Sequence, residues 1–375
     1  MITALLLTQV SFGQVADAWI RFYDTKTELS GYKDLKGNIK IPAKFGELTR
    51  ADTFYHIIAV TETLGNAYKQ YYLLKDGKKV GEDSVYVFDF TFDCEKEGKI
   101  IFRDRKKDRV GFLDKNGAAI IPAEYNYVSP FHNGIAMAHR NAKRKCWEKG
   151  GDAARCEHLG WEGGETILIN EMNEVIADSL RVDLSNVNWY SKRINDPSVD
   201  TGIYVNIRGK NGSTYSFVDY DKEFGKWFYT SFLPSLNNKA ALQGRLFDEV
   251  TYWSQNGGWK SLGKKAFLKT FTAALTAQRF APNKMKEVSI SQGLFNEFIF
   301  DNKIYKKYLN TCGEHDKERY PLYHVMLTYK KERHTTAAGD ATAGAVGDYG
   351  IDYQEHFEFL RTENGYRLIS VSLKR

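Results

Sequence analysis

The sequence lacks the short motifs that mark the commonest catalytic sites. It has no P-loop, no dinucleotide-binding glycine fingerprint, no His-Glu-x-x-His pair and no Gly-x-Ser-x-Gly elbow. It also has no apolar run near the roughly 20 residues that a membrane-spanning helix needs. We therefore expect no cofactor, no metal, no membrane span and no motif-defined catalytic residue. An enzyme is not excluded, because catalytic residues can converge from distant positions.

Cysteine is scarce, with four residues in 375. Cys146 and Cys156 lie ten residues apart in a polar insertion, where a disulfide could close a loop in an oxidising compartment. Free thiols are the alternative. A metal site would need two more ligands, and the neighbouring histidines match no zinc spacing. We expect Cys94 and Cys312 to be unpaired.

The sequence also lacks a large excess of positive or negative charge. The net charge of +6 is mild and the excess is spread along the C-terminal part, so we do not expect nucleic acid as a partner. The insertion at 139–165 holds a denser basic run. Its residues Arg140, Lys143, Arg144 and Lys145 could contact an acidic polymer such as an anionic envelope glycan, and the alternative is a solvated turn.

The first residues suggest export. Ile2–Leu7 is a short apolar run, and the small residues Ser11 and Gly13 fit the −3 and −1 positions of a signal-peptidase site. We expect residues 1–13 to be a signal peptide and the protein to be secreted or periplasmic. The alternative is an ordinary N-terminal strand. No lipobox cysteine follows the run, so a lipid anchor is not supported.

The chain repeats itself. Residues 31–45 and 111–125 align without gaps at an offset of 80, and Gly77 lies forty residues from both Gly37 and Gly117. Each unit has an apolar strand, an Asp-x-x-Gly turn and a second strand that ends at proline. Glycine accepts the positive φ of such a turn, and proline cannot donate to a strand ladder. The unit is therefore predicted to be a β-hairpin.

The repeat pattern resembles a known family. The pattern Gly-aromatic-x-Asp-x-x-Gly-x-x-x-Ile-Pro-x-x-aromatic, followed by Pro-Phe-x-x-Gly-x-Ala, is similar to the WG (KWG-type) repeat of bacterial surface and exported proteins. Val110-Gly111 and Ser30-Gly31 stand in place of the Trp-Gly pair. Fainter copies cover 166–176 and 215–224, which extends the array over residues 18–235. The resemblance implies a structural or binding role without a catalytic constellation.

The region 240–375 is predicted to be an α+β domain. Leu246, Val250 and Trp253 fall at helical spacing, and further helices are expected over 266–280 and 294–309. From Pro321 the apolar period changes to two, which predicts strands. Residues 335–348 are expected to form a flexible loop, and Asn364-Gly365 a hairpin turn.

This order of elements resembles the nuclear transport factor 2-like superfamily. The resemblance implies a cone-shaped fold, often with a pocket, which could present His324, His356 and Glu358 to a ligand. Packed or exposed strand histidines are the alternative interpretation.

We therefore predict a mostly β chain, with an array of short β-hairpin repeats followed by an α+β domain. The preferred function is an exported, non-catalytic scaffold or binding module at the cell envelope, with a protein or an envelope glycan as partner. The alternative is a small-ligand binder or a hydrolase- or isomerase-like enzyme with a pocket in the C-terminal domain. The sequence leaves the oligomeric state open.

Overall fold

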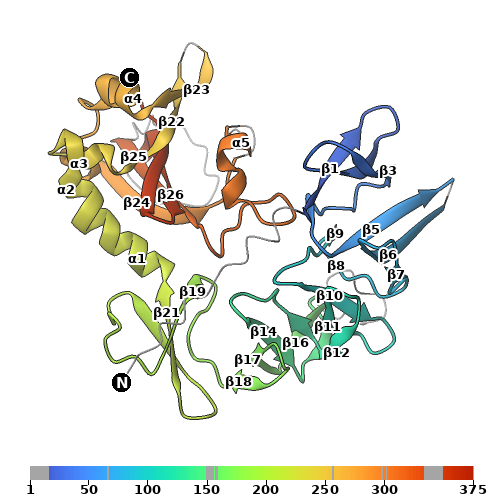
Figure 1. The fold of residues 1–375 in the computed structure, drawn as a ribbon. Coiled ribbons are helices and arrows are strands. Elements are labelled where there is room, and N and C mark those ends of the chain that lie inside the picture. Colours follow the sequence, from blue (N-terminus) through green and yellow to red (C-terminus); the bar gives the residue numbers. More distant parts are fainter. Residues whose placement is uncertain are drawn as a thin grey trace, which may run out of the picture.

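The computed structural model describes residues 17–65, 67–148, 156, 159–255, 257–296, 299–300, 302–332 and 349–374. Strands make up most of its regular structure. A seven-stranded antiparallel sheet and several sheets of two to four strands are followed by one six-stranded sheet with its helices (Figure 1). The prediction of a mostly β chain is confirmed. The predicted signal peptide and the predicted loop at 335–348 lie outside the described residues.

The clearest repeat consists of two sets of three strands that lie 80 residues apart. The first set is β1 (Trp19–Asp24), β2 (Leu29–Asp34) and β3 (Ile39–Phe45), and the second is β10 (Lys99–Asp104), β11 (Arg109–Asp114) and β12 (Ala119–Tyr125). Even the irregularities correspond. Tyr32 pairs with Ile41 and Phe112 with Ile121, and both ladders shift register on either side of that pair.

The turn between the last two strands of each set depends on its aspartate. Oδ1 of Asp114 accepts hydrogen bonds from the backbone N–H groups of Asn116 (2.9 Å) and Ala118 (2.8 Å). Asp34 accepts the equivalent pair, and the side-chain amide of Asn38 donates to it as well. These bonds, with that of Asn38 foremost, lower the pKa of Asp34 to about 2. The predicted turn chemistry is thus present in both copies.

The glycine that follows the missing tryptophan has a steric role. A Cβ atom on Gly111 would lie 2.3 Å from the carbonyl oxygen of Ile121, and one on Gly31 would lie 2.6 Å from that of Ile41. Both distances are far below a normal contact. The bulged neighbouring strand therefore requires glycine at this position.

The other strands of the array continue this pattern. Between Asn170 and Glu174 the turn recurs, with Oδ1 of Asn170 accepting from Met172 N and Glu174 N, and Asn173 (φ 62°) in the place of glycine. The remaining strands are β4 (Thr53–Phe54), β5 (Ile57–Leu64), β6 (Ala67–Leu74), β7 (Lys79–Val80), β8 (Val87–Phe88), β9 (Thr91–Phe92), β13 (Tyr127–Val128), β14 (Ile135–Arg140), β15 (Lys143–Cys146), β16 (Leu159–Glu162), β17 (Glu165–Asn170), β18 (Val175–Ala177), β19 (Val187–Ile194), β20 (Tyr204–Arg208) and β21 (Thr214–Asp219).

Adjacent repeats share their cores. Phe112 belongs to a buried cluster with Phe131 and Ile167, whereas its neighbour Leu113 packs with Ile57 and Tyr72 of the preceding unit. The strand is therefore buried on both faces by different neighbours. This sharing explains why one hairpin could not be stable alone.

The C-terminal sheet has the strand order β23-β22-β27-β26-β25-β24, with β22 and β27 parallel and the other pairs antiparallel. Its strands are β22 (Leu246–Ser254), β23 (Gly258–Gly263), β24 (Lys286–Gly293), β25 (Leu322–Glu332), β26 (Tyr349–Thr362) and β27 (Gly365–Ser372). The helices are α1 (Tyr220–Trp227), the π-helix η2 (Phe228–Phe232), α2 (Leu233–Ser235), α3 (Lys239–Gln243), α4 (Lys264–Phe271), η3 (Ala277–Phe280), α5 (Asn302–Tyr305) and η4 (Lys306–Tyr308).

The boundary between the two parts lies earlier than residue 235. The rings of Phe224, Phe228 and Phe232 contact the ring of Phe359 in the C-terminal sheet, with centroids 4.8–5.8 Å apart. The helical run that starts at Tyr220 therefore belongs to the C-terminal core. The faint repeat at 215–224 is accordingly not a hairpin, because β21 leads directly into α1.

Several predicted helices are shorter or absent. The segment from Leu246 to Trp253 is strand β22, because β23 and β27 pair with it on both sides and override its helical spacing. The predicted helix at 266–280 is divided into α4 and η3, and the one at 294–309 is reduced to α5 and η4. Within the described residues no helix is long and apolar enough to cross a membrane.

Candidate binding site at the junction of the two parts

A loop of the C-terminal domain docks onto the repeat array. We call residues 310–320 the junction loop. The carbonyl oxygen of Thr311 accepts hydrogen bonds from Asp52 N (2.9 Å) and Thr53 N (3.0 Å), and its hydroxyl donates to the carbonyl of Glu95 (2.7 Å). The loop therefore bonds to backbone groups of two successive array segments (Figure 1).

The junction loop begins with a turn of the repeat type. Oδ1 of Asn310 accepts from Cys312 N (2.9 Å) and Glu314 N (3.0 Å), as Asp114 does in the array. Gly313 has φ +78°, and a Cβ there would lie 2.9 Å from Cβ of Asp52. The C-terminal domain thus contacts the array through a turn that has the same hydrogen bonds as the repeat turns.

A disulfide and two ion pairs fix this contact. Cys94 is bonded to Cys312, with 5.7 Å between their Cα atoms and 218 residues between them in sequence. The expectation that both are unpaired was wrong, because folding brings together two cysteines that sequence spacing could not connect. Lys96 pairs with Asp316 (2.9 Å), and Arg50 pairs with Glu314.

A cavity of about 240 Å³ lies beside the disulfide. The array contributes Tyr86, Asp93, Tyr127 and His132 to its walls, and the junction loop contributes Glu318. Cavities between domains, with a few converging polar groups, are the usual places for ligands.

Burial shifts the pKa values of three groups in this cavity toward their neutral forms. Burial raises the pKa of Asp93 to about 7, although the backbone N–H of Ile101 donates to its carboxylate (2.9 Å). Burial also raises the pKa of Glu318. Burial lowers the pKa of His132 to about 4, and its buried Nδ1 has no hydrogen-bond partner. Such shifts are common at functional sites.

An exposed aromatic hairpin stands next to the cavity. Phe88, which lines the cavity, is 62% exposed, and Phe90 at the tip of the β8–β9 hairpin is 86% exposed. Asp89 and Phe90 both have positive φ, a conformation that is unusual for a bulky residue. Exposed aromatic rings beside a cavity add contact area for a ligand or partner.

The three candidate residues of the C-terminal domain come together on one face of the sheet. His324 and Glu358 are cross-strand partners, with Nε2 and Oε1 3.1 Å apart but without hydrogen-bond geometry, and His356 pairs with Met326. Burial lowers the pKa of His356. This face is opposite to the one that carries Tyr323 and Phe357, which belong to the buried core. The three residues therefore do not point into this core.

The basic residues of the insertion lie in and next to the β15–β16 hairpin and are mostly paired. Arg140 pairs with Glu165 (2.9 Å), Arg144 with Asp108 (2.8 Å) and Lys145 with Glu162. The guanidinium of Arg144 also lies 3.9 Å from the ring centroid of Trp161. Lys143 is exposed. Most of the positive charge of this run is therefore neutralised locally.

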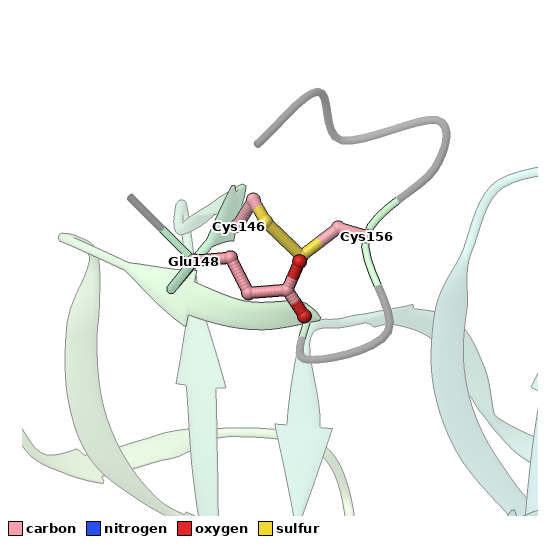
Figure 2. Close-up of side chains that lie close together, drawn as sticks. All are labelled: Cys146, Glu148 and Cys156. Atoms are coloured by element: carbon pink, nitrogen blue, oxygen red, sulfur yellow. A yellow bond between two sulfur atoms is a disulfide. The ribbon is translucent and has the colours of Figure 1, made fainter. Parts of the chain in front are cut away.

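Cys146 and Cys156 form a disulfide, with 5.7 Å between their Cα atoms. Figure 2 shows the Glu148 carboxylate beside the two sulfur atoms. These three residues form the one metal-compatible group among the described residues, but both sulfur atoms are already used in the disulfide. The arrangement is therefore a loop closure, which was one of the alternatives that the sequence left open.

Sequence reasoning missed the junction, although two signals were present. Asn310-x-x-Gly313 has the spacing of the repeat turn, in a region that was assigned to a different fold. Lys96 and His132 occupy equivalent positions, each two residues before a positive-φ glycine, Gly98 or Gly134. Aligning the segments that follow each hairpin would have shown this second equivalence.

Residues 111–143 match the family model described as the WG containing repeat. This stretch holds a WG-type repeat. The match covers the unit from β11 to the start of β15 and agrees with the turn and bulge geometry described above. It concerns this unit and not the whole chain.

Comparison with solved structures adds little. A structure whose title begins Rd1NTF2 is 8% identical, with a TM-score of 0.21, and the match covers 40% of this chain and 97% of that one. Prolyl oligopeptidase B from Galerina marginata is 9% identical, with a TM-score of 0.25, and covers 83% of this chain and 37% of that one. TM-scores of this size do not indicate a shared fold. No curated protein matches the chain.

Proposed function

We propose that this protein is an exported, non-catalytic binding module whose ligand site is the junction cavity. The observation that carries the proposal is the cavity itself, which is built by both parts of the chain and fixed by the Cys94–Cys312 disulfide. Both the repeat array and the C-terminal domain are then needed for binding. The WG-type repeat supports a binding role, since such repeats serve as surfaces for recognition rather than catalysis.

The two disulfides support export to an oxidising compartment. Disulfides persist outside the cytosol and are rare within it, and all four cysteines of the chain are bonded. We propose a location in the periplasm or outside the cell, with an envelope component as ligand. Mass spectrometry of the protein from its native host tests the location, and an intact Met1 would contradict it.

A site inside the C-terminal cone is less well supported. We infer that this domain has the cone-like arrangement of the nuclear transport factor 2-like superfamily, with the helical run from Tyr220 packed on a curved sheet. Its interior is occupied by rings such as Phe224, Phe232, Phe359 and Tyr366, which leaves the histidines on the outer face. The pocket that the alternative function requires is therefore filled by side chains.

A cavity-filling variant tests the binding site. Thr91 lines the cavity, so Thr91→Trp should abolish binding of envelope fragments and partner peptides by the full disulfide-bonded chain. Thr63→Trp, at an exposed position of β5, is the matched control and should bind normally. Equal binding by both variants would place the site elsewhere, and turnover of the bound compound would refute the non-catalytic assignment.

A further inference from the structure

The junction cavity holds two carboxyl groups, Asp93 and Glu318, that feel the charge of Lys96 but form no ion pair with it. In the described part of the chain neither Asp93 nor Glu318 forms an ion pair, although both line the cavity. The other charges of the walls are already compensated, because Lys96 pairs with Asp316 and Glu314 with Arg50. Two carboxyls outside any ion pair provide a site that a bound cation would neutralise.

Aromatic rings surround these carboxyl groups. Tyr86, Phe88 and Tyr127 line the same cavity, and the charge of Asp93 acts on both tyrosines. An ammonium ion over the face of such a ring is attracted by the quadrupole of the ring. The walls therefore combine the two features that recognise organic cations in proteins, a carboxylate and aromatic faces.

His132 is a neutral part of the wall. Its side chain is 6% exposed, and its Nδ1 is buried without a hydrogen-bond partner. Burial lowers the pKa of His132 to about 4, so the imidazole is uncharged at neutral pH. It therefore adds no positive charge that would repel a cation in the cavity.

We propose that the junction cavity binds an alkylammonium group, with Asp93 and Glu318 as counter-charges and Tyr86 and Tyr127 as ring walls. This inference rests on the proposed binding function and names its ligand class. The cavity volume of about 240 Å³ suits one extended side chain rather than a large ligand. The ammonium group can come from a lysine of a partner protein or from a small free amine.

The test is isothermal calorimetry on the full, disulfide-bonded chain with matched probes. N-acetyl-lysine amide should bind at least about tenfold more tightly than N-acetyl-norleucine amide, which lacks the ammonium group. Butylamine should bind as well as the lysine probe if a free amine is the ligand, and more weakly if peptide atoms contribute. Equal binding of the lysine and norleucine probes would overturn the ammonium assignment.

Variants locate the binding to these side chains. Asp93→Asn and Tyr127→Ala should each weaken the lysine probe by about tenfold or more, whereas Tyr127→Phe should retain most of the affinity because the ring remains. Glu287→Gln, an exposed carboxylate on β24, is the control and should bind like the wild type. Unchanged affinity in Asp93→Asn would overturn the proposal.

The pH dependence gives an independent readout. The groups that face Asp93 are Lys96 from its own segment, Tyr72 of β6, Tyr86, Tyr127 of β13 and Glu318 of the junction loop. Asp93, whose pKa burial raises to about 7, loses its proton near neutral pH. Affinity for the lysine probe should therefore rise between about pH 5.5 and pH 8 in the wild type and stay flat in Asp93→Asn.

The outcomes separate this inference from the proposed function. Failure of every amine probe, with envelope fragments still bound and lost in Thr91→Trp, would refute the ammonium assignment and leave the cavity as the site. Failure of the Thr91→Trp comparison would refute the cavity as the binding site, and the ammonium assignment with it.

Discussion

The array and the C-terminal domain bury their apolar side chains in different ways. The array has several small clusters, each formed by strands close in sequence and each shared with the next unit. The C-terminal domain has a large aromatic core that joins Tyr220 at one end to Leu373 at the other, and a second, smaller cluster around Tyr305 and Tyr308. The array is therefore specified locally, whereas the C-terminal domain depends on contacts between distant parts of the chain.

The junction loop belongs to the C-terminal domain but has the turn geometry of the repeat array. Its Asn310 turn has the hydrogen bonds of a repeat turn, and its Gly313 has the close contact of an array glycine. This shared geometry lets the loop dock on the array through backbone hydrogen bonds. The array and the C-terminal domain are therefore joined by a turn that forms from neighbouring residues but contacts a distant part of the chain.

The largest expected effect concerns the disulfide that joins the two parts. By the chain-entropy estimate, a cross-link that spans 218 residues stabilises by about 5 kcal/mol, against about 3 kcal/mol for one that spans ten. Cys94→Ser with Cys312→Ser should therefore cost more than Cys146→Ser with Cys156→Ser in denaturant unfolding. It should also divide unfolding into two transitions. A single unchanged transition would show that the two parts are coupled without the disulfide.

The next effect tests the aromatic core. Phe359 contacts Phe224, Trp227 and Phe232, so Phe359→Ala should lose about 3–5 kcal/mol of stability. Tyr229→Ala removes a ring that is 60% exposed and should change little. Thermal unfolding followed by near-ultraviolet circular dichroism measures both. Comparable losses in the two variants would contradict the burial of the Phe359 ring in this core.

A pair of glycines tests the local rules of the array. Gly111→Ala places a Cβ 2.3 Å from the Ile121 carbonyl oxygen and should cost about 1–3 kcal/mol. A Cβ atom on Gly225 in α1 would have no neighbouring atom within 4 Å, so Gly225→Ala should stabilise by about 0.5–1 kcal/mol. Urea titrations of both variants provide the test. A neutral Gly111→Ala would refute the close approach of the bulged strand.

The last comparison concerns the pH dependence of two carboxyls, beginning with Asp93. Its folded pKa of about 7 lies above the unfolded value of 3.8, so the folded state binds the proton more tightly and stability falls as pH rises between these values. Asp93→Asn keeps an acceptor for Ile101 N and should be more stable than the wild type near pH 8, which urea titrations at pH 5 and pH 8 measure.

The pH dependence of stability that Asp34 causes has the opposite sign to that of Asp93. Its folded pKa of about 2 lies below 3.8, so its stabilising contribution is complete above pH 3.8 and is lost as pH falls toward 2. Asp34→Asn should therefore change the acid limb of the stability curve and not the alkaline one. Identical pH profiles for Asp34→Asn and Asp93→Asn would show that burial does not distinguish the two carboxyls.

The repeat hairpins could be predicted because their chemistry is local. Asp114, Asn116 and Gly117 form a turn with one another, and neighbours in sequence are neighbours in space. The alternation of β25 and β26 likewise placed His324, His356 and Glu358 on strands, as expected. Which face they share depends on the direction in which the sheet curves, and that follows from packing against α1.

The sequence by itself determined the repeat period, the turns and the mostly β character, because each depends on residues a few positions apart. Three features depend on the tertiary structure: the strand at Leu246–Ser254, the domain boundary at Tyr220 and the Cys94–Cys312 disulfide. Each requires partners far away in the chain. The junction cavity belongs to the second group. Its carboxyls, rings and imidazole come from separate segments, and only the docking of the junction loop brings them together.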